Sequence, residues 1–212
     1  MKIAAVIPAY NEAKNLSRVL KPLRECPELA EVIVVSDGST DGTAAVARIM
    51  GARVIELPQN RGKGAAVQAG LQATTAEVIL LLDADLIGLT PRHVQDLLTP
   101  IFNQQAMMTI GYFTSGRLPT DLSQQMAPFL NGQRAVTREL LAALPDLDHS
   151  RYGLEVMMSR YARAKHCKVV WVDLPNLSQV MKEEKIGLVR GFAARLRMYW
   201  QIIKVLVAVR IQ

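Results

Sequence analysis

Two hydrophobic patterns alternate along the first hundred residues of the chain. Short, almost wholly apolar runs such as residues 77–82 have the length and composition of strands that are buried on both faces of a parallel sheet. Between these runs, apolar residues recur every three or four positions, as Leu16, Val19, Leu20 and Leu23 do, which is the spacing of an amphipathic helix. The alternation predicts an α/β fold with a mostly parallel sheet flanked by helices.

The same patterns predict where each element lies. Strands are expected at residues 2–7, 31–35, 52–57, 77–82 and 168–172. Helices are expected at residues 12–24, 43–50, 64–73, 91–102, 137–144, 154–164 and 187–210. Thr90 and Pro91 favour a helix start at that point, and Thr40 or Asp41 is expected to cap the helix that begins at residue 43. Residues 114–129 are polar and contain proline, so we expect a mobile loop there.

Basic residues are concentrated near the C-terminus. Residues 186–212 carry five basic side chains and no acidic one, which leaves 20 basic and 19 acidic side chains in residues 1–185. The nearly neutral body gives no reason to expect a nucleic-acid partner. For the basic segment two interpretations stay open, an amphipathic helix that contacts the inner face of a membrane and a helix packed on the core.

Cysteine content and the two ends of the chain bear on the compartment. Two cysteines, Cys26 and Cys167, provide neither a disulfide framework nor a cysteine zinc site. The apolar run at residues 3–7 is too short for a signal peptide, and the run at residues 205–209 is too short to span a bilayer. We therefore expect a cytoplasmic protein.

Polar residues follow three of the predicted strands, at residues 8–12, 36–42 and 83–85. Each group alone is also typical of an ordinary turn or helix cap. Ligands of open α/β sheets bind beyond the carboxyl ends of the strands, so three such groups at one edge predict a ligand site.

Asp83 and Asp85 have the most specific chemistry of these residues. Carboxylates spaced by two residues share one face of an extended chain, and two like charges held together need a cation or a hydrogen-bonding partner. Hard oxygen ligands suit Mg²⁺ or Mn²⁺, which keep several waters and accept phosphate oxygens as further ligands. The pair therefore predicts a metal-diphosphate site.

A basic glycine loop, Arg61-Gly62-Lys63-Gly64, precedes the third predicted helix. Glycines let the backbone approach a ligand, and a helix N-terminus favours an anion. The loop matches neither a dinucleotide fingerprint nor a P-loop, so it supports the metal-diphosphate site without defining it alone.

These motifs, in this order, resemble family 2 glycosyltransferases with the GT-A fold, and in particular the dolichyl- or polyprenyl-phosphate sugar synthases and the glucosyl-3-phosphoglycerate synthases. The motifs are Pro8-Ala9-Tyr10-Asn11-Glu12, Ser36-Asp37-Gly38-Ser39-Thr40-Asp41-Gly42-Thr43, Arg61-Gly62-Lys63-Gly64-Ala65-Ala66, Leu82-Asp83-Ala84-Asp85, Asn131-Gly132-Gln133-Arg134-Ala135 and Tyr152-Gly153-Leu154-Glu155. The resemblance implies a GT-A domain over residues 1–185, with a nucleotide-binding half (1–90) and an acceptor half (91–185), followed by the basic helix at 186–212.

The resemblance also implies roles for single residues. The expected donor is a uridine diphosphate sugar, and the residues expected to bind it are Pro8, Tyr10, Glu12, Asp37, Ser39, Lys63 and Asp83. Asp37 would contact the base, and Asp85, together with Asp83, would hold Mg²⁺ or Mn²⁺ on the diphosphate. Glu155 is the residue expected to act as general base toward the acceptor, and Asp146 and Asp148 are the alternative candidates.

Several alternatives remain at this stage. Related retaining enzymes use a late histidine as a metal ligand, whereas this chain has Ser178 and Gln179 in that region, so inversion and retention both stay open. The acceptor is either a polyprenyl phosphate or other membrane-proximal molecule, or a soluble molecule as in the glucosyl-3-phosphoglycerate synthases. A sugar-phosphate nucleotidyltransferase and a non-enzymatic nucleotide-binding protein are the other functions considered. The first would need a glycine-rich loop with an arginine after the first strand, which is absent here.

Overall fold

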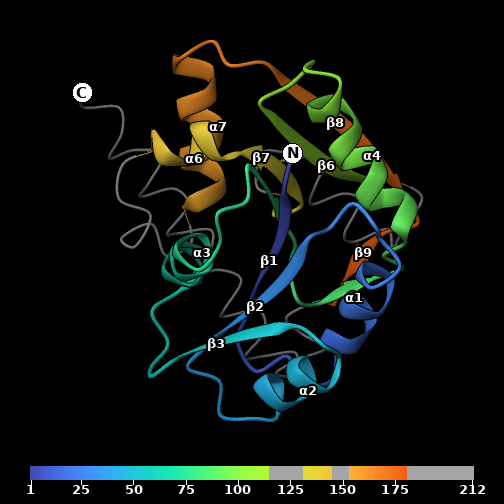
Figure 1. The fold of residues 1–212 in the computed structure, drawn as a ribbon, viewed down its shortest axis with the longest axis vertical. Helices are drawn as coiled ribbons and strands as arrows, with labels where there is room; N and C mark the ends of the chain where they lie inside the picture. The colour runs from blue at the N-terminus through green and yellow to red at the C-terminus, as the bar shows by residue number, and fades with distance from the viewer. Residues whose placement is uncertain (115–130, 145–152, 181–212) are drawn as a thin grey trace, which may run out of the picture.

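A seven-stranded sheet forms the centre of the protein in the computed structural model, which describes residues 1–114, 131–144 and 153–180 (Figure 1). Its strands lie in the order β3-β2-β1-β4-β7-β6-β8. Their bounds are β1 (Ile3–Ala9), β2 (Glu31–Asp37), β3 (Arg53–Leu57), β4 (Val78–Leu81), β6 (Met108–Thr114), β7 (Arg134–Thr137) and β8 (Val169–Pro175). β1 pairs in parallel with β2 and β4, β2 with β3, and β6 with β8. The predicted mostly parallel α/β sheet is therefore confirmed.

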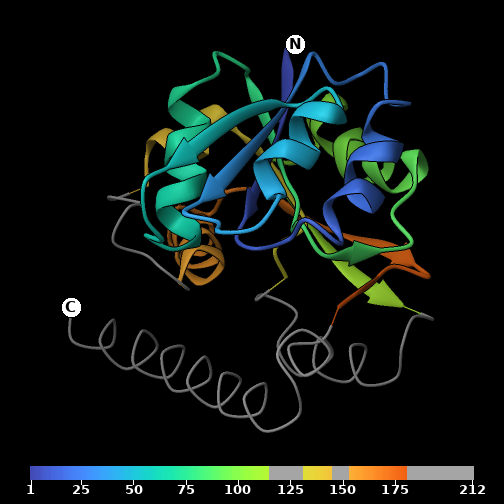
Figure 2. The same cartoon turned by 90° about the horizontal axis from the view of Figure 1, so that it is seen from below.

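Helices cover both faces of this sheet (Figures 1 and 2). The helices are α1 (Leu16–Leu23), α2 (Thr43–Ile49), α3 (Lys63–Gln72), α4 (Pro91–Phe102), α6 (Arg138–Ala142) and α7 (Leu154–Ala164). Side chains of β1 alternate between two cores, because successive residues of a strand point to opposite faces. Ile3, Ala5 and Ile7 pack with α1, α2 and α4, whereas Ala4 and Val6 pack with α3, α6 and α7.

The antiparallel strand β7 joins the two predicted halves of the chain. It lies between β4 and β6 and pairs with both, with Leu81 opposite Arg134 on one side and Ile110 opposite Arg134 on the other. One sheet thus runs through residues 1–90 and 91–180 without a break. The hydrophobic pattern did not predict β7, since the strand has four residues and begins with an arginine.

A second, two-stranded sheet brings the end of the described chain to the aspartate motif. Its strands β5 (Leu86–Ile87) and β9 (Ser178–Gln179) are antiparallel, with Leu86 opposite Gln179. The Val180 amide also donates to the carbonyl of Asp85 at 3.1 Å. Residue 179 is thereby held close to residues 83–85.

Several predicted boundaries are shifted in the structure, and two of the shifts affect the candidate site. α1 begins at Leu16 rather than at residue 12, and the amides of Glu12 and Ala13 donate to Thr43 Oγ1 (2.9 Å) and Asp41 Oδ2 (3.2 Å), which tie the preceding turn to the start of α2. β4 ends at Leu81, and residues 84–85 lie in a turn, so Asp83 and Asp85 do not share the face of an extended strand. By contrast α4 has its predicted bounds, and Thr90 caps it beside Pro91.

Some expectations fall outside the described residues. These are residues 115–129 of the loop expected at 114–129, Asp146, Asp148, Tyr152 and the basic segment at 186–212, whereas Thr114 is the last residue of β6. Among the helices in the described ranges, none combines the length and the hydrophobicity needed to cross a bilayer.

Candidate active site

Two loops at the ends of β1 and β2 are tied together by side chains. Ser39 Oγ accepts the Asn11 amide at 3.1 Å, and Asn11 Oδ1 accepts the Thr40 amide at 2.8 Å. Glu12 joins this edge through the Thr43 hydroxyl, while Pro8 still lies in β1 opposite Val35. Tyr10, 48% exposed, lies on the same loop and leaves an aromatic ring accessible at the edge of the sheet.

Asp37, at the end of β2, holds the basic glycine loop. Its side chain is 4% exposed, and its two oxygens accept the amides of Arg61 and Gly62, both at 2.8 Å. Gly38 has a φ of +65°, and a Cβ there would overlap the backbone of Gln59 and Asn60, so this close approach requires glycine. The end of β2 therefore fixes the loop from which α3 begins.

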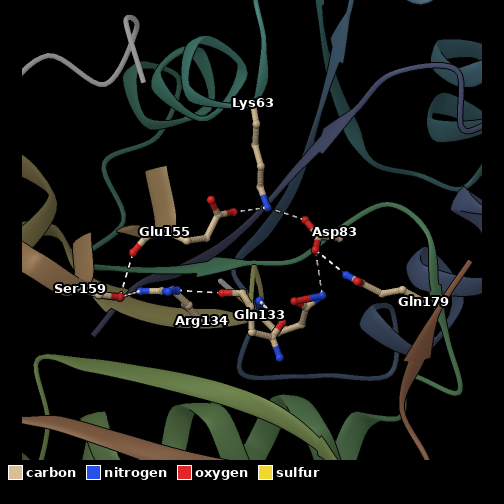
Figure 3. A network of polar contacts seen from close by, with 8 residues as sticks. Lys63, Asp83, Gln133, Arg134, Glu155, Ser159 and Gln179 are labelled. Atoms are coloured by element: carbon tan, nitrogen blue, oxygen red, sulfur yellow. Dashed lines mark hydrogen bonds and ion pairs between the residues drawn. The ribbon is translucent and has the colours of Figure 1, made fainter. Parts of the chain in front are cut away.

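Lys63, the first residue of α3, lies between two carboxylates (Figure 3). Its Nζ is 2.5 Å from Asp83 Oδ1 and 2.5 Å from Glu155 Oε1. Burial alone would lower the pKa of Lys63, but Asp83 and Glu155 raise it above its ordinary value. Lys63 is therefore a fixed positive charge that links the turn after β4 to the start of α7.

Asp83 accepts hydrogen bonds from three different parts of the fold. Besides Lys63, Gln133 Nε2 donates to Asp83 Oδ2 at 3.1 Å and Gln179 Nε2 donates to the same oxygen at 2.6 Å (Figure 3). The donors come from α3, from the residue before β7 and from β9. Three N–H donors hold the carboxylate in one orientation.

Gly132 makes room for this arrangement. A Cβ at residue 132 would lie 2.5 Å from Lys63 Nζ and 2.6 and 2.7 Å from the two oxygens of Asp83. A side chain at this position would displace the ion pair. The glycine is therefore required by the contact between Lys63 and Asp83 rather than by a turn.

Arg134 is completely buried and is linked to Glu155 through Ser159. Its Nε donates to the Asn131 carbonyl at 2.9 Å and its Nη1 to Ser159 Oγ at 3.0 Å, and Ser159 in turn donates to the Glu155 carbonyl at 2.8 Å. Burial lowers the pKa of Arg134 to about 10, against the attraction of Glu155 and Asp83. Arg134 therefore stays charged at neutral pH, and two cations balance the carboxylates of Asp83 and Glu155.

The oxygen ligands at this site suit a divalent cation that takes most of its ligands from water and from a diphosphate. Within the described ranges no three His, Cys, Asp or Glu side chains gather as a complete metal site. Asp83 is engaged by three N–H donors, and the carboxylate of Asp85 lies in the adjoining turn. Mg²⁺ binds proteins through one or two carboxylates and completes its coordination with water and phosphate oxygens, so a single aspartate is compatible with it.

Comparison with known proteins assigns the chain to a family. The model for glycosyl transferase family 2 matches residues 4–166, which include every residue of this network except Gln179. The chain belongs to glycosyl transferase family 2.

Relatives in this family include proteins with different acceptors. Glucosyl-3-phosphoglycerate synthase of Mycobacterium tuberculosis is 29% identical over 192 residues, which covers 73% of this chain and 58% of that protein. A dolichyl-phosphate beta-glucosyltransferase of Trichomonas vaginalis is 42% identical over 94 residues, or 38% of this chain and 28% of that protein. The chain thus spans less than two thirds of the length of these curated relatives.

Solved structures of the mycobacterial synthase have the same fold. One, in complex with Mn²⁺, UDP-glucose and phosphoglyceric acid, has a TM-score of 0.71 at 27% identity and covers 84% of this chain and 71% of that one. Another, with Mn²⁺ and UDP-glucose, has a TM-score of 0.78 at 26% identity and covers 98% and 78%. The GT-A fold expected from the sequence is therefore confirmed.

This family 2 chain brings most of its predicted site residues to one edge of the sheet. Lys63, Asp83 and Glu155 are in direct contact, and Asp85 follows in the turn. The sequence analysis assigns no role to Gly132, Gln133, Arg134, Gln179 and Ser159, although all five belong to the network. The first three lie in a motif that was noted only for its resemblance, and Gln179 was noted only as standing where a histidine was expected.

Proposed function

We propose that this family 2 protein transfers a sugar from a uridine diphosphate sugar, bound with Mg²⁺ or Mn²⁺, to a small acceptor. The observation that carries the proposal is the ion-paired chain Asp83–Lys63–Glu155, which couples the aspartate motif of the donor half to the acceptor half. The mycobacterial synthases, solved with Mn²⁺ and UDP-glucose, support the same donor here.

The donor would lie along the edge formed by the ends of β1 and β2. Tyr10 offers an exposed ring for the base, and Pro8, Glu12 and Ser39 line or support the same edge. Asp37 would have two roles at this edge. It holds the loop at residues 60–62, and its remaining lone pairs would accept the imide N–H of uracil.

Asp85 would hold the metal, and Asp83 would face the ribose or the sugar. When bound, the metal neutralises negative charge on the diphosphate, which makes the nucleotide a better leaving group. The protein's own part is orientation, because Lys63, Gln133 and Gln179 fix the Asp83 carboxylate before any ligand arrives.

Glu155 would act on the acceptor. It is 7% exposed at the start of α7, with one oxygen paired to Lys63. A hydroxyl acceptor must lose a proton as it attacks, and a positioned carboxylate can take it. A phosphate acceptor needs no base, and Glu155 would then only keep Lys63 in place.

The length of the match favours a soluble, phosphoglycerate-like acceptor. The synthases align with 73% of this chain, whereas the dolichyl-phosphate enzyme aligns with 38% of it. A polyprenyl phosphate is the second candidate, because the segment at 186–212 has five basic side chains and no acidic one. Family membership disfavours the nucleotidyltransferase alternative.

Mass spectrometry of reaction mixtures tests the proposal. Purified protein is incubated with UDP-glucose or GDP-mannose, with Mn²⁺ or EDTA, and with either 3-phosphoglycerate or polyprenyl phosphate in vesicles. We expect transfer from UDP-glucose that EDTA abolishes and that Asp85→Ala removes, while the exposed Glu139→Gln change leaves it intact. Transfer that ignores both EDTA and Asp85→Ala would refute the metal role. Co-sedimentation of the protein with anionic vesicles at low salt would support the lipid acceptor, and no co-sedimentation would favour the soluble one.

A further inference from the structure

A cavity of about 620 Å³ lies between α4 and the edge strand β8, which are neighbours in Figure 1. Its wall contains three carboxylates, Glu28, Asp96 and Asp173, and two aromatic rings, Phe102 and Trp171. It includes none of the residues of the Lys63 network. Its volume is within the range of small-molecule sites, so its lining indicates which ligand would fit.

The two aromatic side chains are unusually accessible. Trp171 is 46% exposed and Phe102 is 42% exposed, whereas most large apolar side chains among the described residues are buried. The face of an aromatic ring carries a negative quadrupole, and tryptophan attracts a nearby cation most strongly. Two open rings at one cavity are therefore suited to a positively charged group on an apolar stem.

Only one of the two carboxylate oxygens of Glu28 has a hydrogen-bond donor among the described residues. Its Oε1 accepts Gln95 Nε2 at 3.0 Å, but its Oε2 is buried and has no hydrogen-bond partner within the described part of the chain. A buried carboxylate oxygen without a donor is costly, and a donor that carries positive charge would relieve the cost best.

The charge around the cavity is negative. Arg92 is engaged with Asp96 at 2.9 Å, so it does not neutralise Glu28 or Asp173. Burial raises the pKa of the Cys26 thiol to about 11, and the carboxylates of Glu28 and Glu25 add to the shift. Residues 1–185 have 20 basic and 19 acidic side chains, so a negative cavity is not a general property of this part of the chain.

We propose that this cavity binds an organic cation, a guanidinium or ammonium group on an aliphatic stem. The charged head would lie at Glu28 and Asp173, and the stem would pack between Phe102 and Trp171. Because the site shares no residue with the Lys63 network, the proposal does not depend on the transferase function.

Fluorescence of Trp171 provides the test. The chain has two tryptophans, so Trp200→Phe leaves Trp171 as the only reporter. The probes are n-butylguanidinium chloride and its neutral isostere n-butylurea, titrated at constant ionic strength. We expect a saturable change with n-butylguanidinium and none with n-butylurea. Equal responses to the two probes, or no response to either, would overturn the proposal.

A matched pair of variants locates the site. Glu28→Gln keeps the shape and the acceptor for Gln95, and should weaken binding of n-butylguanidinium about tenfold. Glu25→Gln removes the same charge from an exposed residue that does not line the cavity, and should change binding less than about twofold. Equal weakening in both variants would mean non-specific attraction and would refute the site. If Glu28→Gln does not fold, Asp173→Asn takes its place, with the same expectation.

The source of the cation is distinguished by a third probe, the capped tripeptide acetyl-Gly-Arg-Gly-amide. Tighter binding of the tripeptide than of n-butylguanidinium would support the cavity and identify its ligand as an arginine of a protein segment. Weaker binding of the tripeptide would support the cavity with a free small cation as the ligand.

Discussion

Lys63 Nζ and Glu155 Oε1 lie 2.5 Å apart and join the first turns of α3 and α7. Since Lys63 also contacts Asp83, one ammonium group connects the segment after β4 to the start of α7. A ligand that changes the charge at Asp83 will therefore change the contact between Lys63 and Glu155. This relationship makes the network testable one residue at a time.

Replacing Glu155 by glutamine separates two roles of this side chain. With a hydroxyl acceptor, loss of a general base should lower kcat about a hundredfold or more with little change in KM. With a phosphate acceptor, kcat should stay within a few-fold of wild type, because the amide oxygen can still accept from Lys63. Steady-state kinetics measure both constants, and the exposed Glu139→Gln change is the control. A large rise in KM at unchanged kcat would contradict both roles.

Gly132→Ala should damage activity more than stability. The new Cβ would come within 2.7 Å of Lys63 Nζ and both Asp83 oxygens, and the ion pair would have to move. Displacements of about 1 Å can cost about 10²-fold in rate, whereas the flexible end of Lys63 can yield at a cost of about 1 kcal/mol. Gly42→Ala is the matched control, since its nearest neighbour would be Ala13 Cβ at 3.9 Å. Thermal melting and transfer rates are compared, and full activity of Gly132→Ala would show that the contact is dispensable.

Gln179 is expected to position Asp83. Removing a charge-assisted hydrogen bond of 2.6 Å with Gln179→Ala should weaken UDP-glucose binding about tenfold. Gln179→Glu should be worse, because it places a second carboxylate beside Asp83. Calorimetric titration with UDP-glucose and Mn²⁺ measures the effect, and exposed Gln105→Ala is the control. The idea fails if the glutamate variant binds as well as wild type.

His93 should make the fold less stable in mild acid. Its Nδ1 accepts the Thr90 amide at 3.3 Å, so Nε2 carries the proton donated to the Pro175 carbonyl at 3.0 Å. Burial lowers the pKa of His93 below its ordinary value, although Pro175 and the carboxylates of Asp96 and Asp173 oppose the shift. The unfolded chain therefore takes up a proton first as the pH falls below about 6.5, and the stability present above that pH is lost.

Melting curves at pH 8 and pH 5 check this sign. Wild type should lose about 3 °C more than His93→Gln, which keeps an N–H donor but does not titrate. An equal loss in the two proteins would assign the acid sensitivity to other groups.

The pattern of the sequence predicted those features that depend on neighbouring residues. Apart from β5, the strands and helices up to residue 102 follow from local periodicity. Their ends shift, for example at residues 12–13, whose amides donate to Thr43 and Asp41. Asp83 is predictable because it follows an apolar run, Lys63 because it lies in a basic glycine loop, and Glu155 because its motif resembles the family.

The remaining parts depend on tertiary contact and left little trace in the sequence. Arg134 is completely buried yet reads as a surface residue, because only Asn131, Ser159 and the nearby carboxylates make its burial tolerable. Gln133 and Gln179 carry no charge, and their importance comes from where β7 and β9 place them. Gly132 matters for the atoms around it, which no single sequence reveals.

The position of β7 has a consequence for how the chain folds during synthesis. Residues 1–90 contain β1 to β4, and until β7 is made, β4 is an open edge strand whose four residues are all buried in the finished protein. Open apolar edges recruit strands from other molecules. A nascent or truncated chain that stops near residue 90 would therefore be prone to aggregate, and emergence of residues 134–137 from the ribosome is the step that removes this hazard.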